Sequence, residues 1–182
     1  MQEPRDEATA GARASFVRRL VAFLLDGVVL LVAGFALLTL TTVVIGPTVL
    51  LELESAASPV SEVRTWRVVL NAVVLAALSS VYFVISWSRF GQTPGQRLFR
   101  LAVRGASPAA GITPRRAVLR WSLLGAPLGL ASALTVSMPL LFLAVLVASF
   151  AWFGVLLVTT LVSRTGRGLH DRLAGTTVIR RA

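Results

Sequence analysis

The chain has 182 residues, of which 55% are hydrophobic and only 14% are charged, and its mean hydropathy is +0.79. Soluble domains carry roughly 25% charged residues, so this composition excludes a water-soluble globule and a disordered chain, and the lack of cysteine excludes a disulfide-stabilised scaffold. The net charge of +10 comes from 18 arginines and no lysine, and because the arginines lie between long apolar runs they indicate a membrane protein and no nucleic-acid partner.

The N-terminal residues 1–14 contain no short apolar core followed by a small-residue cleavage site, as a signal peptide would. We therefore expect a flexible cytoplasmic leader over 1–14 and a single membrane domain over 15–182. The first transmembrane helix is expected over about 16–45. No charge occurs from Gly27 to Leu51, and about 20 apolar residues are enough to cross the hydrocarbon core.

Asp26 is the most informative residue of this first helix. It lies about 10 Å deeper than Arg19 and on the same face, because seven residues make nearly two helical turns. A carboxylate at this depth costs on the order of 3 kcal/mol. Three interpretations are open: a buried arginine–aspartate pair that fixes helix register, a site for a proton, cation or substrate, and a side chain that reaches the membrane interface.

The second transmembrane helix is expected over about 67–88, since 21 uncharged residues separate Arg67 from Arg89. We expect Asn71 to form a hydrogen bond between helices, in preference to lining a permeation route. Aromatic residues near the two ends of the helix are typical of the belts at membrane interfaces. They are Trp66, Tyr82 and Trp87.

The connection over 89–120 is rich in arginine and opens with a turn, which glycine and proline mark in the segment 91–98. The residues that follow, 98–104, are basic and amphipathic, which fits an interfacial helix or a short strand. The C-terminal segment 174–180 ends in a β-branched run that is typical of a strand. We expect these two segments to pair as a small cytoplasmic sheet, because strand edges are tolerated outside the hydrocarbon.

Between Arg120 and Arg164 the chain runs for 43 residues without a charge. A single helix of that length would measure about 65 Å, twice the bilayer. We expect it to fold back at 137–139, where Pro139 starts a helix more readily than it continues one. The third span is then about 117–136 and the fourth about 139–163. The third contains two glycines and a proline, and it either crosses the membrane or forms a re-entrant or interfacial segment.

Small residues recur at four-residue spacing in the second and third spans. Such stripes let helix backbones approach closely in lipid, and they predict packing within the bundle or, alternatively, a seam between copies of the chain. The stripes are Ala72, Ala76 and Ser80 in the second span and Gly125, Gly129, Ala133 and Ser137 in the third.

The arginines give an independent count of the spans. With four spans, 16 arginines lie on one side of the membrane and only Arg64 and Arg67 on the other. The positive-inside rule then places both termini in the cytoplasm of a multi-pass protein of the cell membrane. Three spans would put the arginine-rich tail outside. We therefore expect an all-α membrane protein with four transmembrane helices and a small basic cytoplasmic subdomain that includes a short β pairing.

Three motifs, in order along the chain, resemble the RDD family, which is named for one arginine and two aspartates. They are Arg19-x-x-Ala22-x-x-x-Asp26, then Gly91-Gln92-Thr93-Pro94-Gly95-x-Arg97-Leu98, then His170-Asp171-x-Leu173-Ala174-Gly175-Thr176-x-Val178. The resemblance implies that Arg19, Asp26 and Asp171 are the named trio. It also implies an integral membrane protein, of a family for which transport has been proposed. One departure is Gln96, where the family usually has lysine.

Asp171 has three open interpretations. It caps a turn or helix, it forms a salt bridge that docks the tail onto the arginine-rich connection, for instance at Arg97, or it is a direct ion site. The supporting residues that the motifs imply are Gly91, Gln92, Thr93, Gly95, Arg97, His170, Gly175 and Thr176.

We expect no enzyme, no cofactor and no metal, because the chain has one histidine, no cysteine and no recognisable nucleophile or phosphate-binding motif. Two functions remain. One is transport or cation–proton exchange with Asp26 as the intramembrane group. The other is a non-transporting adaptor or assembly partner of another membrane complex. The expected partners are the lipid bilayer, anionic headgroups attracted by arginine, and a second copy of the chain or another membrane protein.

Overall fold

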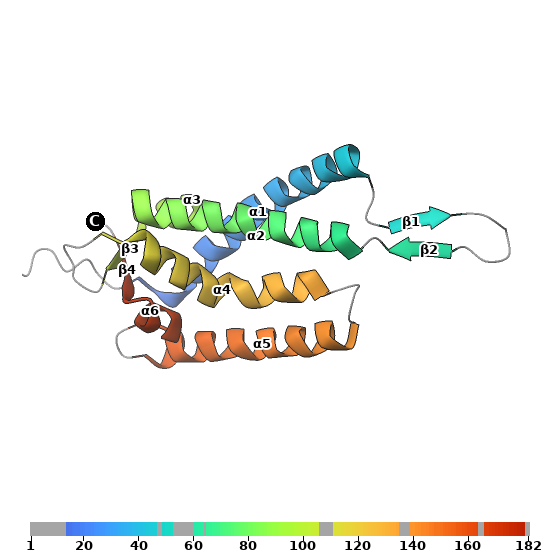
Figure 1. Cartoon of the computed structure of the whole chain (residues 1–182). Helices are drawn as coiled ribbons and strands as arrows, with labels where there is room; N and C mark the ends of the chain where they lie inside the picture. The colour runs from blue at the N-terminus through green and yellow to red at the C-terminus, as the bar shows by residue number, and fades with distance from the viewer. Residues whose placement is uncertain are drawn as a thin grey trace, which may run out of the picture.

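A computed structural model describes residues 14–46, 49–52, 60–63, 65–105, 111–134, 139–163 and 166–180. Four long helices dominate the fold (Figure 1), and α1 crosses α2 at an angle while α2, α4 and α5 lie side by side. The helices are α1 (Phe16–Ile45), α2 (Thr65–Ile85), α4 (Pro114–Leu134) and α5 (Pro139–Val162).

Three helices of the described residues are long and apolar enough to cross a membrane: Phe16–Ile45, Trp66–Phe90 and Leu140–Val162. Large apolar side chains cover their outer surfaces; Phe35 of α1, for example, is 74% exposed. Lipid solvates such side chains, so the exposure is compatible with a membrane setting. The expected helical membrane fold is confirmed. Since α4 is not among the three, a membrane crossing over 117–136 stays a prediction.

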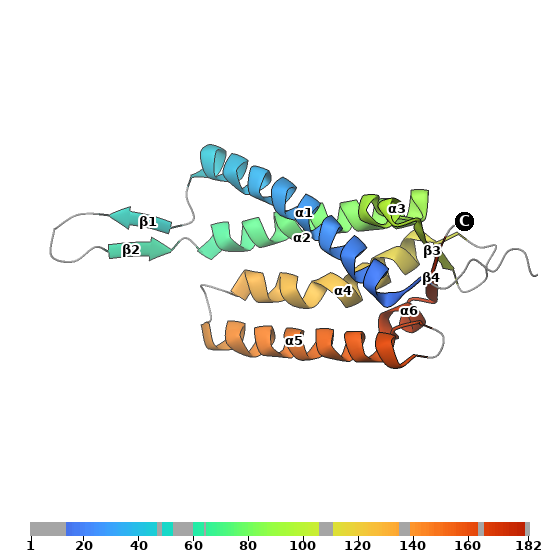
Figure 2. The same cartoon turned by 180° about the vertical axis from the view of Figure 1, so that it is seen from behind.

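The long uncharged stretch folds back on itself as expected. α4 ends at Leu134, α5 begins at Pro139, and the two helices run antiparallel (Figure 2). Residues 135–138, which include most of the predicted turn and Ser137 of the small-residue stripe, lie outside the described residues, as does the predicted leader up to residue 13.

Pro127 lies inside α4, yet the helix continues past it. Because proline has no N–H, the carbonyl oxygen of Leu123 one turn earlier loses its usual donor. The indole Nε1–H of Trp152 in α5 donates to that oxygen at 2.7 Å. A neighbouring helix thus satisfies the polar group that the proline leaves open, as membrane helices require, and the same bond joins α4 to α5.

The predicted small-residue stripes of α2 and α4 face each other within the chain. Ala72 and Ala76 of α2 line the same interhelical space as Gly125 and Gly129 of α4. Packing inside the bundle therefore uses the stripes. Thr41 of α1 also donates to the side-chain oxygen of Asn71 in α2 at 3.2 Å, which is the interhelical hydrogen bond expected there.

The end of α2 widens into a short π-helix, η2 (Ser86–Phe90), which stops at Gly91 with φ of +67°. Glycine adopts this left-handed conformation without steric cost, and its N–H donates to the carbonyl of Trp87. Trp87 is only 2% exposed, whereas Trp66 is 55% exposed. Trp87 is therefore a core residue, and its predicted place in an interfacial aromatic belt is wrong.

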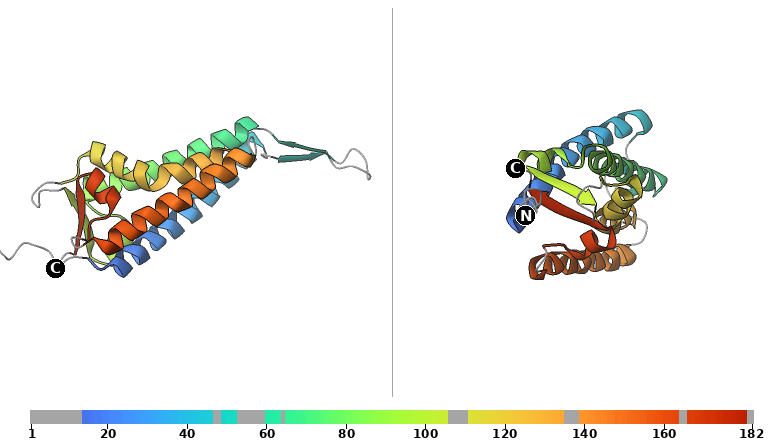
Figure 3. Two further views of the ribbon diagram at one scale, coloured as in Figure 1. Left: turned by 90° about the horizontal axis from the view of Figure 1, so that it is seen from below. Right: turned by 90° about the vertical axis from the view of Figure 1, so that its left-hand side faces the viewer.

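The two ends of the bundle differ (Figure 3). One end carries an antiparallel hairpin of β1 (Val49–Glu52) and β2 (Val60–Val63), which the sequence analysis did not anticipate. The other end holds the start of α1 and the end of the described chain together with four short elements. These are α3 (Pro94–Leu98), β3 (Leu101–Gly105), α6 (Leu169–Leu173) and β4 (Thr176–Arg180).

β3 and β4 pair antiparallel, with Leu101 opposite Arg180 and Gly105 opposite Thr176. This confirms the predicted pairing of the segment after the 91–98 turn with the C-terminal strand. The sheet covers the end of the helix bundle at which α1 begins.

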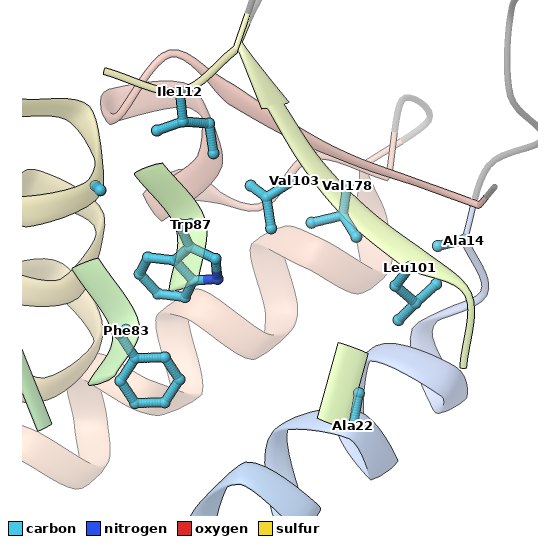
Figure 4. Close-up of a cluster of buried hydrophobic side chains, with 9 residues drawn as sticks. Ala14, Ala22, Phe83, Trp87, Leu101, Val103, Ile112 and Val178 are labelled. Atoms are coloured by element: carbon cyan, nitrogen blue, oxygen red, sulfur yellow. The ribbon is translucent and has the colours of Figure 1, made fainter. Parts of the chain in front are cut away.

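A hydrophobic core lies between this sheet and the helix ends. Figure 4 shows Leu101 and Val103 of β3 and Val178 of β4 pointing toward Phe83 and Trp87 at the end of α2. Leu101 and Val103 are fully buried. Burying an aliphatic side chain of this size contributes about 1.5–3 kcal/mol, so the core holds the sheet against the helices and positions the motif residues around it.

Candidate functional site

The carboxylate of Asp26 is buried between α1 and α3 and accepts three hydrogen bonds. The Tyr82 hydroxyl donates to Oδ1 at 2.7 Å, the Gly95 N–H donates to the same oxygen at 2.8 Å, and the Thr93 hydroxyl donates to Oδ2 at 2.5 Å. Asp26 is 1% exposed. We call these four residues the Asp26 site. Both carboxylate oxygens are occupied by uncharged donors, which compensates the charge without a cation.

Gly95 permits this close contact of α3 with α1. A Cβ atom on Gly95 would lie 2.3 Å from the backbone oxygen of Ala22 and 2.8 Å from Oδ1 of Asp26. Ala22 is fully buried, and its carbonyl belongs to the backbone of α1. A side chain at position 95 would therefore push the two helices apart.

The start of α3 is formed by a reciprocal capping box. The Thr93 hydroxyl accepts from the Gln96 N–H at 3.2 Å, and the Gln96 side-chain oxygen accepts from the Thr93 N–H at 3.0 Å. The same Gln96 oxygen accepts from the indole of Trp87 at 3.2 Å. Lysine has no acceptor, so the glutamine at this position makes contacts that the family's usual lysine would not.

Arg19 does not pair with Asp26 in the described structure. Its Nη1 donates to the carbonyl of Gly166 at 2.6 Å, its Nη2 donates to that of Val178 at 3.0 Å, and Nη1 lies 3.7 Å from Asp171 Oδ2. The residue lies in the first turn of α1, where its long side chain reaches the C-terminal segment. Arg19 and Asp26, which were expected on one face of α1, therefore belong to two separate sites and do not form an ion pair with each other.

Asp171 lies at the centre of a second buried group, which we call the Asp171 cluster. Arg120 Nη1 forms a short hydrogen bond to Oδ1 of Asp171 and donates to the Thr176 hydroxyl at 2.7 Å. Thr176 in turn donates to Oδ1 at 3.3 Å. Asp171 and Thr176 are fully buried and Arg120 is 4% exposed. The cluster consists of Arg19, Arg120, His170, Asp171 and Thr176.

This geometry shows which contacts Asp171 makes in the described structure. The carboxylate docks the tail onto the arginine-rich connection, but its partner there is Arg120 at the end of that segment. Arg97, named above as an example, is exposed on α3. Arg120 also stacks over the ring of Trp87, with its Cζ 5.1 Å from the centroid, so the core and the cluster hold the guanidinium together.

Electrostatics sets the protonation of the two titratable neighbours in α6. Burial would raise the pKa of the Asp171 carboxyl, but Arg120, with smaller contributions from His170 and Arg19, holds it below its usual value. Burial lowers the pKa of His170 to about 4, helped by the positive charge of Arg120. At neutral pH the cluster thus contains an ionised aspartate, a neutral histidine and two arginines.

The remaining motif residues shape the backbone. Gly91 ends η2 and accepts a hydrogen bond from the Val103 N–H at 2.7 Å, and the Gln92 N–H donates to the carbonyl of Ser86 at 3.2 Å. Gly175, with φ of +61°, forms the turn from α6 into β4. These residues position the two sites without contributing side-chain chemistry.

Sequence reasoning missed two key contacts, those of Tyr82 and Arg120. Tyr82 was assigned to an interfacial belt, and Arg120 was one of seven arginines in the 89–120 connection. The only available signal for Arg120 was its position as the last charge before the uncharged stretch. Gly168 was also missed: a Cβ there would lie 2.2 Å from the Thr160 hydroxyl oxygen, so α6 starts against the end of α5.

A cavity of about 340 Å³ lies between the first turns of α1 and the last turns of α5 and joins both sites. The polar residues that border it are Arg19, Asp26, Gln96, Arg120, Thr160, His170 and Asp171. Its remaining lining is mainly apolar and comes largely from phenylalanine and leucine side chains of α1 and α5.

Comparison with known families gives a family match. The model of the RDD family matches residues 13–175, which is most of the chain and includes Asp26, Arg120 and Asp171. No match was found among curated proteins or among solved structures.

Proposed function

Because the chain belongs to the RDD family, we propose that it is a four-span protein of the cell membrane that acts as a non-transporting adaptor or assembly partner. The observation that carries this proposal is the set of protein donors around the buried carboxylate of Asp26. Its two oxygens accept three hydrogen bonds from Tyr82, Thr93 and Gly95. An ion-exchange site needs an acidic group that can release its protein partners for a cation or proton, whereas this one joins α1, α2 and α3 as a structural tie.

The pairing of β3 with β4 supports four spans. The chain leaves the sheet after β3, forms the α4–α5 hairpin and returns to the same sheet at β4. The chain between the two strands therefore crosses the membrane an even number of times. α5 is long and apolar enough to cross, and α4 is then its return partner. The arginine-rich end, with both termini, belongs in the cytoplasm by the positive-inside rule.

The outer half of α1 supports a role in assembly. Beyond Asp26, Gly34 is the only residue of α1 in the described chain that is buried, and Figure 1 shows this half diverging from α4 and α5, while Thr41 still contacts Asn71 of α2. Side chains there, such as Phe35, are exposed to lipid or to a partner helix. The proposal includes no enzymatic activity.

Transport is the second candidate, and one observation favours it. Asp171 lines the cavity, and its buried Oδ2 accepts no hydrogen bond among the described residues, although Arg19 Nη1 lies 3.7 Å from it. A buried titratable group in a cavity is a candidate for a functional site.

Flux through reconstituted protein separates the two candidates. Purified wild type and Asp26→Asn are placed in liposomes at matched folded protein, and proton movement is followed with a pH-sensitive dye under sodium, potassium or lithium gradients. We expect no flux above empty liposomes. The variant should be less stable by about 1–3 kcal/mol, since asparagine offers only one acceptor oxygen to three donors. Wild-type flux that disappears in a folded Asp26→Asn variant would overturn the adaptor proposal.

Photocrosslinking in native membranes supplies the positive test. A photoreactive residue at Phe35 of α1 is expected to give one discrete product, a copy of the chain or another membrane protein. The same residue at Leu140 of α5, which is also highly exposed at 84%, serves as the matched control and should give lipid adducts only. Lipid adducts alone at both positions would contradict assembly through α1.

A further inference from the structure

The cavity between α1 and α5 opens toward lipid and not only toward water. Leu20 and Phe23 of α1 and Leu157 of α5 line it and are each more than 40% exposed on the outer surface of the helices. Its mouth is therefore apolar and lies within the span of two helices that are long and apolar enough to cross a membrane. A volume of about 340 Å³ falls at the lower end of the range for small-molecule sites and suits one hydrocarbon chain.

The charged end of the cavity carries an excess of positive charge. Arg19 and Arg120 approach a single carboxylate, that of Asp171, while His170 is neutral at pH 7 because burial lowers its pKa to about 4. Asp26 borders the cavity as well, but it lies about 10 Å farther along α1 than Arg19, away from this end. The Nε atoms of Arg19 and Arg120 are buried and find no acceptor among the described residues, so the cluster has unused donor capacity.

The charged residues of the cavity lie near the helix ends, and its apolar residues lie farther along the helices. Arg19 is in the first turn of α1, and Thr160, which lines the same cavity, is in the last turn of α5, so the charged end lies at headgroup level. Phe153 lies nine residues before the end of α5, or about 14 Å deeper at 1.5 Å per residue. A ligand that fits this gradient has an anionic head and an apolar tail.

We propose that this cavity is a binding site for one anionic phospholipid, with the phosphate against Arg19 and Arg120 and one acyl chain along Phe23, Phe153 and Leu157. The bilayer supplies the ligand, and the basic end of the protein attracts anionic headgroups to the site. The inference does not rest on the adaptor role, because lipid binding is measured without flux or partner.

Gly154 provides a variant that fills the cavity. It lines the cavity, and a Cβ there would meet nothing within 4 Å, so Gly154→Leu places its side chain in the space of the acyl chain. The matched control is Gly111→Leu before α4, which lies outside the cavity and is equally open to a Cβ.

The test is native mass spectrometry of the full chain in detergent, titrated with dioleoyl phosphatidylglycerol or with dioleoyl phosphatidylcholine, which has the same acyl chains. We expect wild type and Gly111→Leu to retain one phosphatidylglycerol preferentially. Gly154→Leu should bind phosphatidylglycerol with an affinity at least about ten-fold lower, because the acyl chain can no longer be buried in the cavity. Equal retention of the two lipids by wild type, undiminished binding by Gly154→Leu, or equal loss in both variants would overturn the site.

Arg19→Gln tests the headgroup contact separately, with thermal melting as the check on folding. Glutamine keeps one donor for the carbonyls of Gly166 and Val178 but removes the charge. The preference for phosphatidylglycerol over phosphatidylcholine should fall toward one while binding of both lipids persists. An unchanged preference in the folded variant would contradict the proposed position of the phosphate.

Discussion

Asp26 and Asp171 are both buried carboxylates, yet the protein compensates them differently. Asp26 receives two hydroxyls and one backbone N–H, while Asp171 receives arginine and threonine. Neutral donors can satisfy a carboxylate deep between helices without bringing a second charge out of water, which avoids part of the desolvation cost of an ion pair. The arginine pairing occurs at the end of the bundle, although Asp171 is as fully buried there as Asp26.

Gly95 is predicted to control the contact between α3 and α1. Gly95→Ala places a Cβ 2.3 Å from the backbone oxygen of Ala22, so the helices must separate and Asp26 loses its backbone donor. We expect a loss of about 1–3 kcal/mol in the free energy of unfolding, measured by thermal denaturation in detergent. Gly111→Ala is the control, since its Cβ would meet nothing within 4 Å. Equal melting temperatures for the two variants would refute the close contact.

His170 is predicted to make the protein less stable in mild acid. Its pKa is lowered from 6.5 to about 4 by burial and by the charges of Arg120 and Arg19, which outweigh Asp171. Between these two pH values the unfolded chain binds a proton that the folded chain does not, so the free energy of unfolding falls as pH falls. The full shift corresponds to about 3 kcal/mol.

The comparison of wild type with His170→Gln measures this effect. Thermal melting from pH 7 to pH 4 should show a slope for wild type that the variant lacks. The pKa of Asp171 lies below its usual value, so its stabilising charge is lost only at still lower pH and does not contribute in this window. Identical slopes for the two proteins would contradict a buried neutral histidine.

Among the elements, α4 depends most on a neighbour. Trp152→Phe removes the donor to the Leu123 carbonyl that Pro127 leaves without a backbone partner. We expect this change to cost about 1–3 kcal/mol, the penalty for an unsatisfied buried acceptor. In a Pro127→Ala background the new backbone N–H can donate to the same oxygen, so Trp152→Phe should then cost less. A double-mutant cycle of melting free energies checks this, and equal costs in both backgrounds would disprove the compensation.

The elements themselves were largely predictable, because lipid imposes length and polarity rules on a local sequence. The uncharged runs predicted α1 and the fold-back before α5, and the β-branched run after Gly175 predicted β4. The contacts of the sites were not predictable to the same degree. Helical spacing placed Arg19 and Asp26 on one face, but Tyr82 and Thr93 lie 56 and 67 residues from Asp26, and only tertiary packing brings them to it.

Local sequence patterns also could not identify which of several similar residues makes a given contact. Arg97 and Arg120 both belong to the basic 89–120 connection, and which of them meets Asp171 depends on the direction in which α4 leaves β3. Trp87 resembled an interfacial residue by its position near a helix end, but the sheet that covers that end buries it. Sequence patterns therefore indicated which residue types are in contact, whereas the tertiary structure determines which residue of each type makes the contact.

At the scale of the whole molecule, the three family motifs meet at one end. The first contributes Arg19 and Asp26 from α1, the second contributes Thr93 and Gly95 before and within α3, and the third contributes Asp171 from α6. The two sites tie the start, the middle and the end of the chain together around the β3–β4 sheet. The opposite end carries the β1–β2 hairpin, so the long axis of the protein has two chemically distinct ends (Figure 3).

This division predicts the topology, and three single-cysteine variants test it in a chain that has no cysteine of its own. Ser61→Cys in the hairpin should react with a membrane-impermeant maleimide in intact cells, because it lies outside. Gly111→Cys and Leu173→Cys should react only after permeabilisation, because β3–β4 pairing keeps both ends of the α4–α5 hairpin on one side. The wild-type chain, without a thiol, gives the background. Labelling of Leu173→Cys but not of Gly111→Cys in intact cells would mean that α4 does not cross, and protection of Ser61→Cys would mean that the orientation is reversed.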